Sequence, residues 1–168
     1  MKTNKHVLPL KRKRLGKTDY RLRLRLVSSR KPRLVIRRSL KNILLQLVQY
    51  HPTGDKIFVS AEGKELKMYG WQGTTRNTPV AYLTGYLLGC KVKKQKVATE
   101  AVLDIGLYKA VKGSLLFAAA KGAADAGLAV PFSADILPSQ ERIQGKHLKQ
   151  GSFDVVLKTL KEKFKTSP

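Results

Sequence analysis

The 168-residue sequence contains a single cysteine, few acidic residues and no long apolar run. The one thiol, Cys90, cannot form a disulfide within the chain, and no second cysteine stands at the spacing of a metal-binding or redox pair. A secreted fold held together by disulfides and a metal site made of thiols are therefore disfavoured. We expect a cytoplasmic protein in a reducing compartment.

Metal and membrane sites are also disfavoured. His6, His51 and His147 are scattered, and none stands at ligand spacing from another histidine or from Cys90, so we expect surface histidines and no metal. The first residues lack the apolar segment of about 7 to 15 residues that a secretory signal needs. No stretch reaches the roughly 18 apolar residues of a membrane span. We expect no cofactor, no membrane and no small-molecule substrate.

Acidic residues are scarce relative to basic ones. Eleven Asp and Glu face 34 Lys and Arg, which gives a net charge of +23 and a pI near 10.4. Such self-repulsion points to a polyanionic partner, above all a nucleic acid. With 42% hydrophobic residues, the chain can still bury a core. The sequence therefore predicts a basic, globular protein.

The positive charge is concentrated at the start of the chain. Residues 1–41 hold 16 Lys and Arg against one acid, Asp19, whereas the remaining residues hold 18 against ten. Little apolar material precedes Leu22. We predict a basic RNA-binding arm over 1–32, a globular α/β core over 33–138, and a C-terminal extension with a helix over 139–168.

The arm has two parts. The run Lys11-Arg12-Lys13-Arg14 repels itself in water and gains order by neutralising phosphates, although a solvated or nuclear-targeting-type tail would look the same. The stretch 18–27 alternates basic and apolar residues, as a strand would, but Thr18 or Asp19 suits a helix N-cap, and we favour a short helix. Either conformation lines up cationic groups suited to phosphate: Arg21, Arg23, Arg25, Arg30, Lys31 and Arg33.

The body begins with strand patterns. In 33–38, Leu34 and Ile36 share one face while Arg33 and Arg37 share the other. Further strands are expected over 42–50 and 56–61, joined by a turn over 51–55 that contains proline and glycine. Short links favour an antiparallel three-strand meander.

Helical periods follow. We expect a helix over 78–96 with Pro79 in its first turn, a short buried strand over 100–105, and an alanine-rich helix over 114–126 that can approach a neighbour closely. Residues 130–138 are expected to form a loop, and 152–165 a last helix. The predicted fold class is α+β: a mixed sheet, the meander plus one further strand, covered by helices, with a basic N-terminal arm and a C-terminal helix.

No catalytic pattern is convincing. Asp104 ends a predicted strand, where some nucleases hold metal, but one carboxylate cannot hold two ions, so we expect a structural hydrogen-bond acceptor. The loop 106–114 lacks Walker spacing, although the backbone at Ser114 could hold an anion. Neither Ser114 nor Cys90 has a histidine and an acid in readable reach. We expect no enzyme.

Aromatic residues could stack on unpaired bases, an interaction of about 1 to 3 kcal/mol each. Most are expected in the core or at its rim. Tyr20 lies in the arm, and Tyr69 and Trp71 lie in a glycine-flanked loop. We include Tyr20 and Trp71 among the candidate RNA-contacting residues.

Four segments look familiar together: KRKRLGKTDYRLRLRLVSSRKPRLV (11–35), RLVIRRSLKNILLQLV (33–48), YGWQGTTRNTPVAYLTGYLLG (69–89) and EAVLDIGLYKAVKGSLLFAAAKGAADAGLAVPFS (100–133). They resemble large-subunit ribosomal protein eighteen in its archaeal form, over nearly the whole chain. Bacterial relatives are similar mainly across the strand and two-helix core. The longer eukaryotic relatives carry C-terminal extensions that this sequence does not show.

The resemblance implies a structural constituent of the large ribosomal subunit. Such a protein binds 5S rRNA in the central protuberance and links it to large-subunit rRNA and neighbouring ribosomal proteins. Carried onto this sequence, the RNA-binding residues are Lys11, Arg12, Lys13, Arg14, Arg21, Arg23, Arg25, Arg30, Lys31, Arg33, Arg37, Arg38 and Lys41. A general nucleic-acid coat and an enzyme with a ribonuclease H-like sheet stay as alternatives, separable by duplex-DNA competition and magnesium-dependent cleavage.

Overall fold

The structure is a computed structural model that describes residues 8–148 and 152–165. Its centre is a four-stranded sheet in the order β3-β2-β1-β4. Strands β1, β2 and β3 form an antiparallel meander, and β4 pairs parallel with β1. Their bounds are β1 Arg33–Arg38, β2 Ile43–Gln49, β3 Lys56–Glu62 and β4 Val102–Asp104. The predicted mixed sheet is confirmed.

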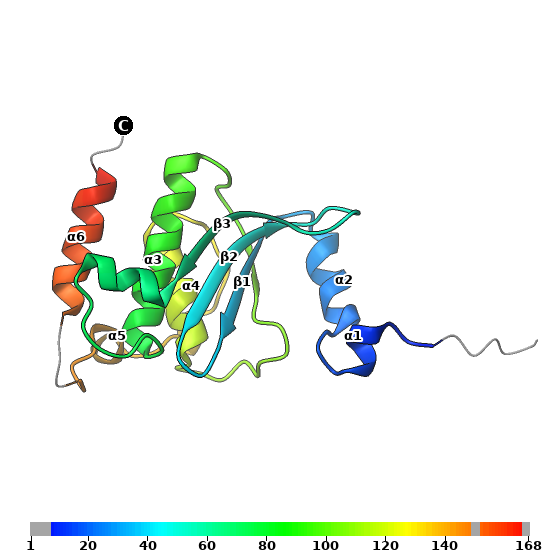
Figure 1. Cartoon of the computed structure of the whole chain (residues 1–168), viewed down its shortest axis with the longest axis horizontal. Helices are drawn as coiled ribbons and strands as arrows, with labels where there is room; N and C mark the ends of the chain where they lie inside the picture. Colours follow the sequence, from blue (N-terminus) through cyan, green and yellow to red (C-terminus); the bar gives the residue numbers. More distant parts are fainter. Residues whose placement is uncertain (1–7, 149–151, 166–168) are drawn as a thin grey trace, which may run out of the picture.

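Two helices cover one face of this sheet. Helix α3, Thr78–Gln95, packs on β2 and β3, and helix α4, Leu115–Asp125, lies beside it and reaches β1 (Figure 1). The sheet supplies alternate side chains to this layer, because neighbouring residues of a strand point to opposite faces. The fully buried members of the sheet are Leu34, Ile36, Ile43, Leu45, Leu47 and Ala61.

Helices α3 and α4 approach each other at two glycines. A Cβ added at Gly85 would clash with the carbonyl of Ala119, and one added at Gly122 would clash with the carbonyl of Tyr82. Ala118, Ala119 and other small residues complete the contact, so the two backbones touch almost directly. The close approach expected for the alanine-rich helix is confirmed.

The opposite face of the sheet is covered by neither α3 nor α4, and we call it the open face. The arm lies over part of it. Figure 1 shows α1, Lys11–Arg14, and α2, Tyr20–Ser28, on the side of the sheet away from α3, α4 and α6. Asp19 caps α2 through bonds from the backbone N–H groups of Arg21 and Leu22. The short arm helix and its N-cap are therefore confirmed, and the one-turn α1 was not predicted.

The C-terminal helix α6, Phe153–Lys165, packs on α3 and on the 3-10 segment η1, Gly63–Tyr69. Phe153, Val156 and Leu160 are buried, and the Phe153 ring lies 5.7 Å from that of Tyr82. The last helix predicted from the sequence is confirmed, and these apolar residues form the face that joins the body. The division of the chain into three parts stays a prediction.

Three short elements besides α1 lay outside the sequence predictions. They are η1, the 3-10 turn η2, Ala134–Ile136, inside the predicted loop, and α5, Gln140–Gln144. Each is brief, so the periodicity that identifies long helices has no room to appear. η1 begins with a capping box, in which Glu62 and Glu65 each bond the other's backbone N–H. The sequence signature of such a box has Ser, Thr, Asp or Asn at the N-cap, so a box with Glu62 at that position could not be predicted from it.

Candidate nucleic-acid interface

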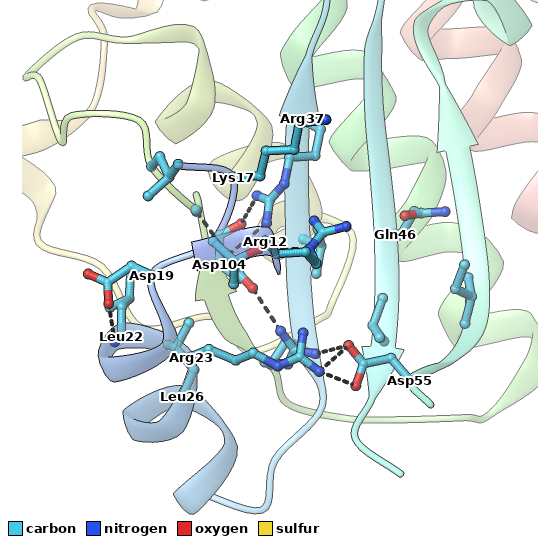
Figure 2. Close-up of a pocket in the computed structure, with 17 residues that line it drawn as sticks. Arg12, Lys17, Asp19, Leu22, Arg23, Leu26, Arg37, Gln46, Asp55 and Asp104 are labelled. Atoms are coloured by element: carbon cyan, nitrogen blue, oxygen red, sulfur yellow. Dashed lines mark hydrogen bonds and ion pairs between the residues drawn. The ribbon is translucent and has the colours of Figure 1, made fainter. Parts of the chain in front are cut away.

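The arm and the open face enclose a cleft of about 320 Å³. Its lining includes Leu22 and Leu26 of α2 and Val35, Val48 and Ile57 of the sheet. Figure 2 shows Leu22 and Leu26 on the arm helix and Gln46 on the sheet. Val48 is only 5% exposed although it lies on the open face. The arm helix therefore lies against the body and shields part of the sheet from water.

Charged side chains alternate along the floor of this cleft. Arg23 of α2 reaches both oxygens of Asp55 at 2.9 and 3.0 Å, and Asp55 also accepts a 2.6 Å bond from Arg33. Arg33 reaches Asp104 at 2.9 Å with its other terminal nitrogen. Arg37 also lies 3.1 Å from Asp104. Three arginines and two aspartates therefore form one continuous series of ion pairs, which we call the charge ladder: Arg23, Asp55, Arg33, Asp104 and Arg37.

The two carboxylates have different surroundings. The Asp104 side chain is 7% exposed and takes a third bond from the backbone N–H of Gly106. The Asp55 side chain is 23% exposed and lies at the end of the β2–β3 turn, facing the arm. The expected role of Asp104 as a structural acceptor is confirmed. Asp55 joins the arm to the body.

Most of the predicted RNA-contacting residues lie at the surface. Those exposed are Lys11, Arg12, Lys13, Arg14, Arg21, Arg25, Arg30, Lys31, Arg38 and Lys41, and those half-buried are Tyr20, Arg23 and Arg37. Arg38 stacks on the ring of Tyr108 at 5.1 Å, and the Tyr108 hydroxyl donates to the Arg38 carbonyl. The exposed set places cations at intervals between Lys11 and Lys41, and exposed Lys and Arg side chains are the groups that neutralise phosphates.

Arg33 and Trp71 lie inside the protein. The Arg33 side chain is 4% exposed and both its terminal nitrogens bond aspartates, so burial and these two ion pairs keep its guanidinium from a phosphate at the surface. Trp71 is 4% exposed in the core, and its ring N–H donates to the Thr74 carbonyl. In this conformation neither side chain can contact RNA, so neither belongs to the exposed basic surface.

The physical reason for these two placements is pairing and packing. Arg33 begins β1 beside Val102 of β4, and Asp104 lies two residues further along that strand. A buried arginine is tolerated because these carboxylates compensate its charge. Trp71 follows η1 and closes it through a bond from its backbone N–H to the Leu66 carbonyl.

Basic residues that sequence reasoning passed over extend the surface. Arg76 is exposed and donates to the Leu40 carbonyl beside the β1–β2 turn, where the Thr75 hydroxyl also bonds the Lys41 carbonyl. Lys109 and Lys112 are exposed on the loop that holds Tyr108. These residues are far apart in sequence, so only the fold could bring them to the same end of the sheet.

Other chemistry finds little support in the residues that the structure describes. Within 8–148 and 152–165 there is no group of three His, Cys, Asp or Glu side chains placed to hold a metal ion. The same residues form no helix that is long and apolar enough to cross a membrane. Burial raises the pKa of the Cys90 thiol to about 11, which keeps it protonated and weakly nucleophilic at neutral pH.

The fold and this surface define a basic α+β protein with an exposed cationic arm. The model of the family described as ribosomal large subunit proteins 60S L5 and 50S L18 matches residues 4–98 and 90–133. The chain therefore belongs to this family, and it has a structural role in the large ribosomal subunit.

Two archaeal relatives agree with this assignment. The chain is 47% identical over 147 residues to the large ribosomal subunit protein uL18 of Korarchaeum cryptofilum, covering 88% of this chain and 75% of that one. It is 49% identical over 141 residues to uL18 of Thermofilum pendens, covering 84% and 71%. The resemblance to the archaeal form is confirmed.

Proposed function

We propose that this protein binds 5S rRNA and helps to attach it to large-subunit rRNA in the central protuberance. The observation that carries the proposal is the exposed cationic arm, seated on a folded body that belongs to a large-subunit ribosomal family. The protein then acts as a structural link and catalyses nothing. Neighbouring ribosomal proteins would complete its surroundings.

The arm supplies most of the phosphate contacts. All four residues of α1 are basic and exposed, and Arg21 and Arg25 are exposed on α2. A guanidinium group can donate two parallel hydrogen bonds to one phosphate, which adds geometry to charge. Because an RNA duplex has a deep and narrow major groove, such contacts recognise backbone shape rather than base sequence.

The body fixes the register of those contacts. Arg38, Lys41 and Arg76 lie near the end of the sheet where β1 turns into β2. Arg38 is held over the Tyr108 ring, so its position is set by the loop after β4. A folded RNA that spans arm and body would be recognised by the distance between the two cationic groups.

The test is selective binding. Purified intact protein and a version beginning at Pro32 are each mixed with labelled 5S rRNA and a large excess of transfer RNA. The proposal predicts that the intact protein retains 5S rRNA and that the truncated protein loses most of its affinity. Equal displacement by transfer RNA would show that the protein binds RNA without selectivity. Displacement of 5S rRNA by duplex DNA would identify a general nucleic-acid-coating protein.

A further inference from the structure

An acidic residue holds the arm in place. Asp55 lies between Arg23 of α2 and Arg33 of β1, at 2.9 and 2.6 Å. Every carboxylate near bound RNA repels phosphates, and this chain has only eleven acids against 34 basic residues. The carboxylate beside the cationic arm therefore weakens the attraction of the arm for RNA phosphates. Its presence there needs another explanation.

Apart from the apolar contact of Leu22 and Leu26 with the sheet, the arm helix has few other attachments to the body. None of the nine residues of α2 is buried, and Leu24 is 69% exposed. Among the described residues, the nearby ties are Lys31 to Glu100, both about half exposed, and Gln49 to the Arg30 carbonyl at 3.5 Å. Solvent-exposed pairs contribute little. The pairing of Arg23 with Asp55 is thus the best-formed polar tie of α2.

Asp55 is itself fixed from behind. Arg33 is 4% exposed and is held on its far side by Asp104, which bonds the Gly106 N–H as well. The carboxylate of Asp55 therefore cannot follow Arg23 if the helix swings away. A pre-set arm loses less conformational freedom on binding than a free one does.

We infer that Asp55 is a positioning residue for RNA recognition: it fixes α2 on the sheet so that Arg21 and Arg25 meet phosphates at a set distance from the cations of the body. This inference rests on the proposed function and adds the determinant of its selectivity. Arg23 then acts mainly through Asp55, while its exposed neighbours contact RNA.

If Asp55 positions the arm, its loss should weaken binding to 5S rRNA, whereas net charge alone predicts that its loss strengthens binding. Asp55→Asn removes a negative charge, so attraction alone predicts equal or tighter binding to any RNA. Positioning predicts instead that affinity for 5S rRNA falls about tenfold, because the arm must be ordered on binding. Affinity for transfer RNA should stay the same or rise, so selectivity falls by about tenfold or more.

Two variants control for charge and for the carboxylate. Asp154→Asn makes the same charge change on α6, at an exposed residue on the other side of the body (Figure 1). It should leave selectivity unchanged. Asp55→Glu keeps the carboxylate and should retain most of the selectivity that Asp55→Asn loses.

A variant on the arm side keeps the test valid if Asp55→Asn unfolds the protein. Arg23→Gln leaves Arg33 between its two aspartates, so the body stays intact. Arg23→Gln should lower selectivity as Asp55→Asn does, but it should not change the slope of log affinity against log salt concentration. Arg25→Gln removes a phosphate contact and should make that slope smaller by about 0.7 to 0.9. The double variant Arg23→Gln/Asp55→Asn should be no worse than Asp55→Asn alone, because both changes break the same contact between Arg23 and Asp55.

The experiment is competition of labelled 5S rRNA by transfer RNA, together with thermal unfolding, for the full chain and these variants. A selective intact protein whose Asp55→Asn and Arg23→Gln variants lose selectivity, while Asp154→Asn keeps it, supports the inference. A selective intact protein with all variants equally selective overturns the inference and leaves the proposed function standing. An unselective intact protein overturns the proposed function and the inference with it.

Discussion

The arm and the body of this protein keep their shapes by different means. The body buries an apolar core in which Leu34, Leu45 and Leu83 are fully shielded, whereas no residue of α2 is buried. The arm instead depends on the Asp19 cap, on the contact with Asp55 and on the partly exposed Leu22 and Leu26 beside the sheet. Packing fixes the body firmly, and an ion pair fixes the arm weakly, so the two regions should respond to different changes.

The largest expected effect comes from removing the arm. If the arm makes half a dozen phosphate contacts, a protein beginning at Pro32 should bind 5S rRNA on the order of 10³-fold more weakly at moderate salt. Its slope of log affinity against log salt should be smaller by about 4 to 5. Affinity measured from low to high salt checks this. An unchanged slope in a folded truncated protein would place the contacts on the body.

The next effect contrasts two arginines of the same chain. Arg33→Gln breaks a buried ion pair on both sides and should lower the free energy of unfolding by about 3 kcal/mol. Arg25→Gln, at an exposed residue, should change stability by less than about 0.5 kcal/mol. Denaturant unfolding of the two variants measures both. Similar stabilities would mean that the charge ladder is not formed in solution.

Close packing of the body gives a third contrast. Gly85→Ala sets a methyl group against the carbonyl of Ala119 and should cost about 3 kcal/mol, which lowers Tm by about 10 °C. Leu24→Ala, on the exposed face of the arm helix, is the matched change and should leave Tm almost unaltered. Differential scanning calorimetry compares them. Equal Tm values would contradict the close contact of α3 with α4.

The smallest effect on function is expected at Cys90, which reports on the body alone. Burial raises its thiol pKa from 9.0 to about 11, and the thiolate is the reactive form, so alkylation at pH 8 should be about a hundredfold slower than in the unfolded chain. Because the pKa is raised in the folded state, this group contributes stability below about pH 9 that is lost as the pH rises through 11.

Alkylation rates across this pH range, with and without the arm, measure the Cys90 effect. The body keeps its fold without the arm in this account, so the two rates should agree. A thiol that reacts as fast as a free one at pH 8 would show that the end of α3 is open to solvent.

Much of the body could be predicted from its sequence because its elements are long and periodic. Alternation in 33–38 identified β1 and its buried face, and the spacing of apolar residues identified α3 and α6. The short segments η1 and α5 could not be found this way. Their structure depends on capping and on contacts with distant residues.

The candidate site was harder to predict, because charge alone does not say where an arginine points. Arg33 and Arg25 lie in similar basic and apolar surroundings in the sequence, yet one is buried between two aspartates and the other is exposed. The decisive partners, Asp55 and Asp104, are 22 and 71 residues away from Arg33 in the chain. Only the pairing of β1 with β4 and the β2–β3 turn bring them together.

Lysine footprinting tests the central claim most directly. The intact protein is acetylated with and without 5S rRNA, and the protection of each lysine is measured by mass spectrometry. The account predicts strong protection of Lys11, Lys13 and Lys41, with Lys94 at the end of α3 and Lys158 on α6 remaining reactive. Equal protection of all five would contradict it, because the arm and the sheet end would then not be the RNA-binding surface.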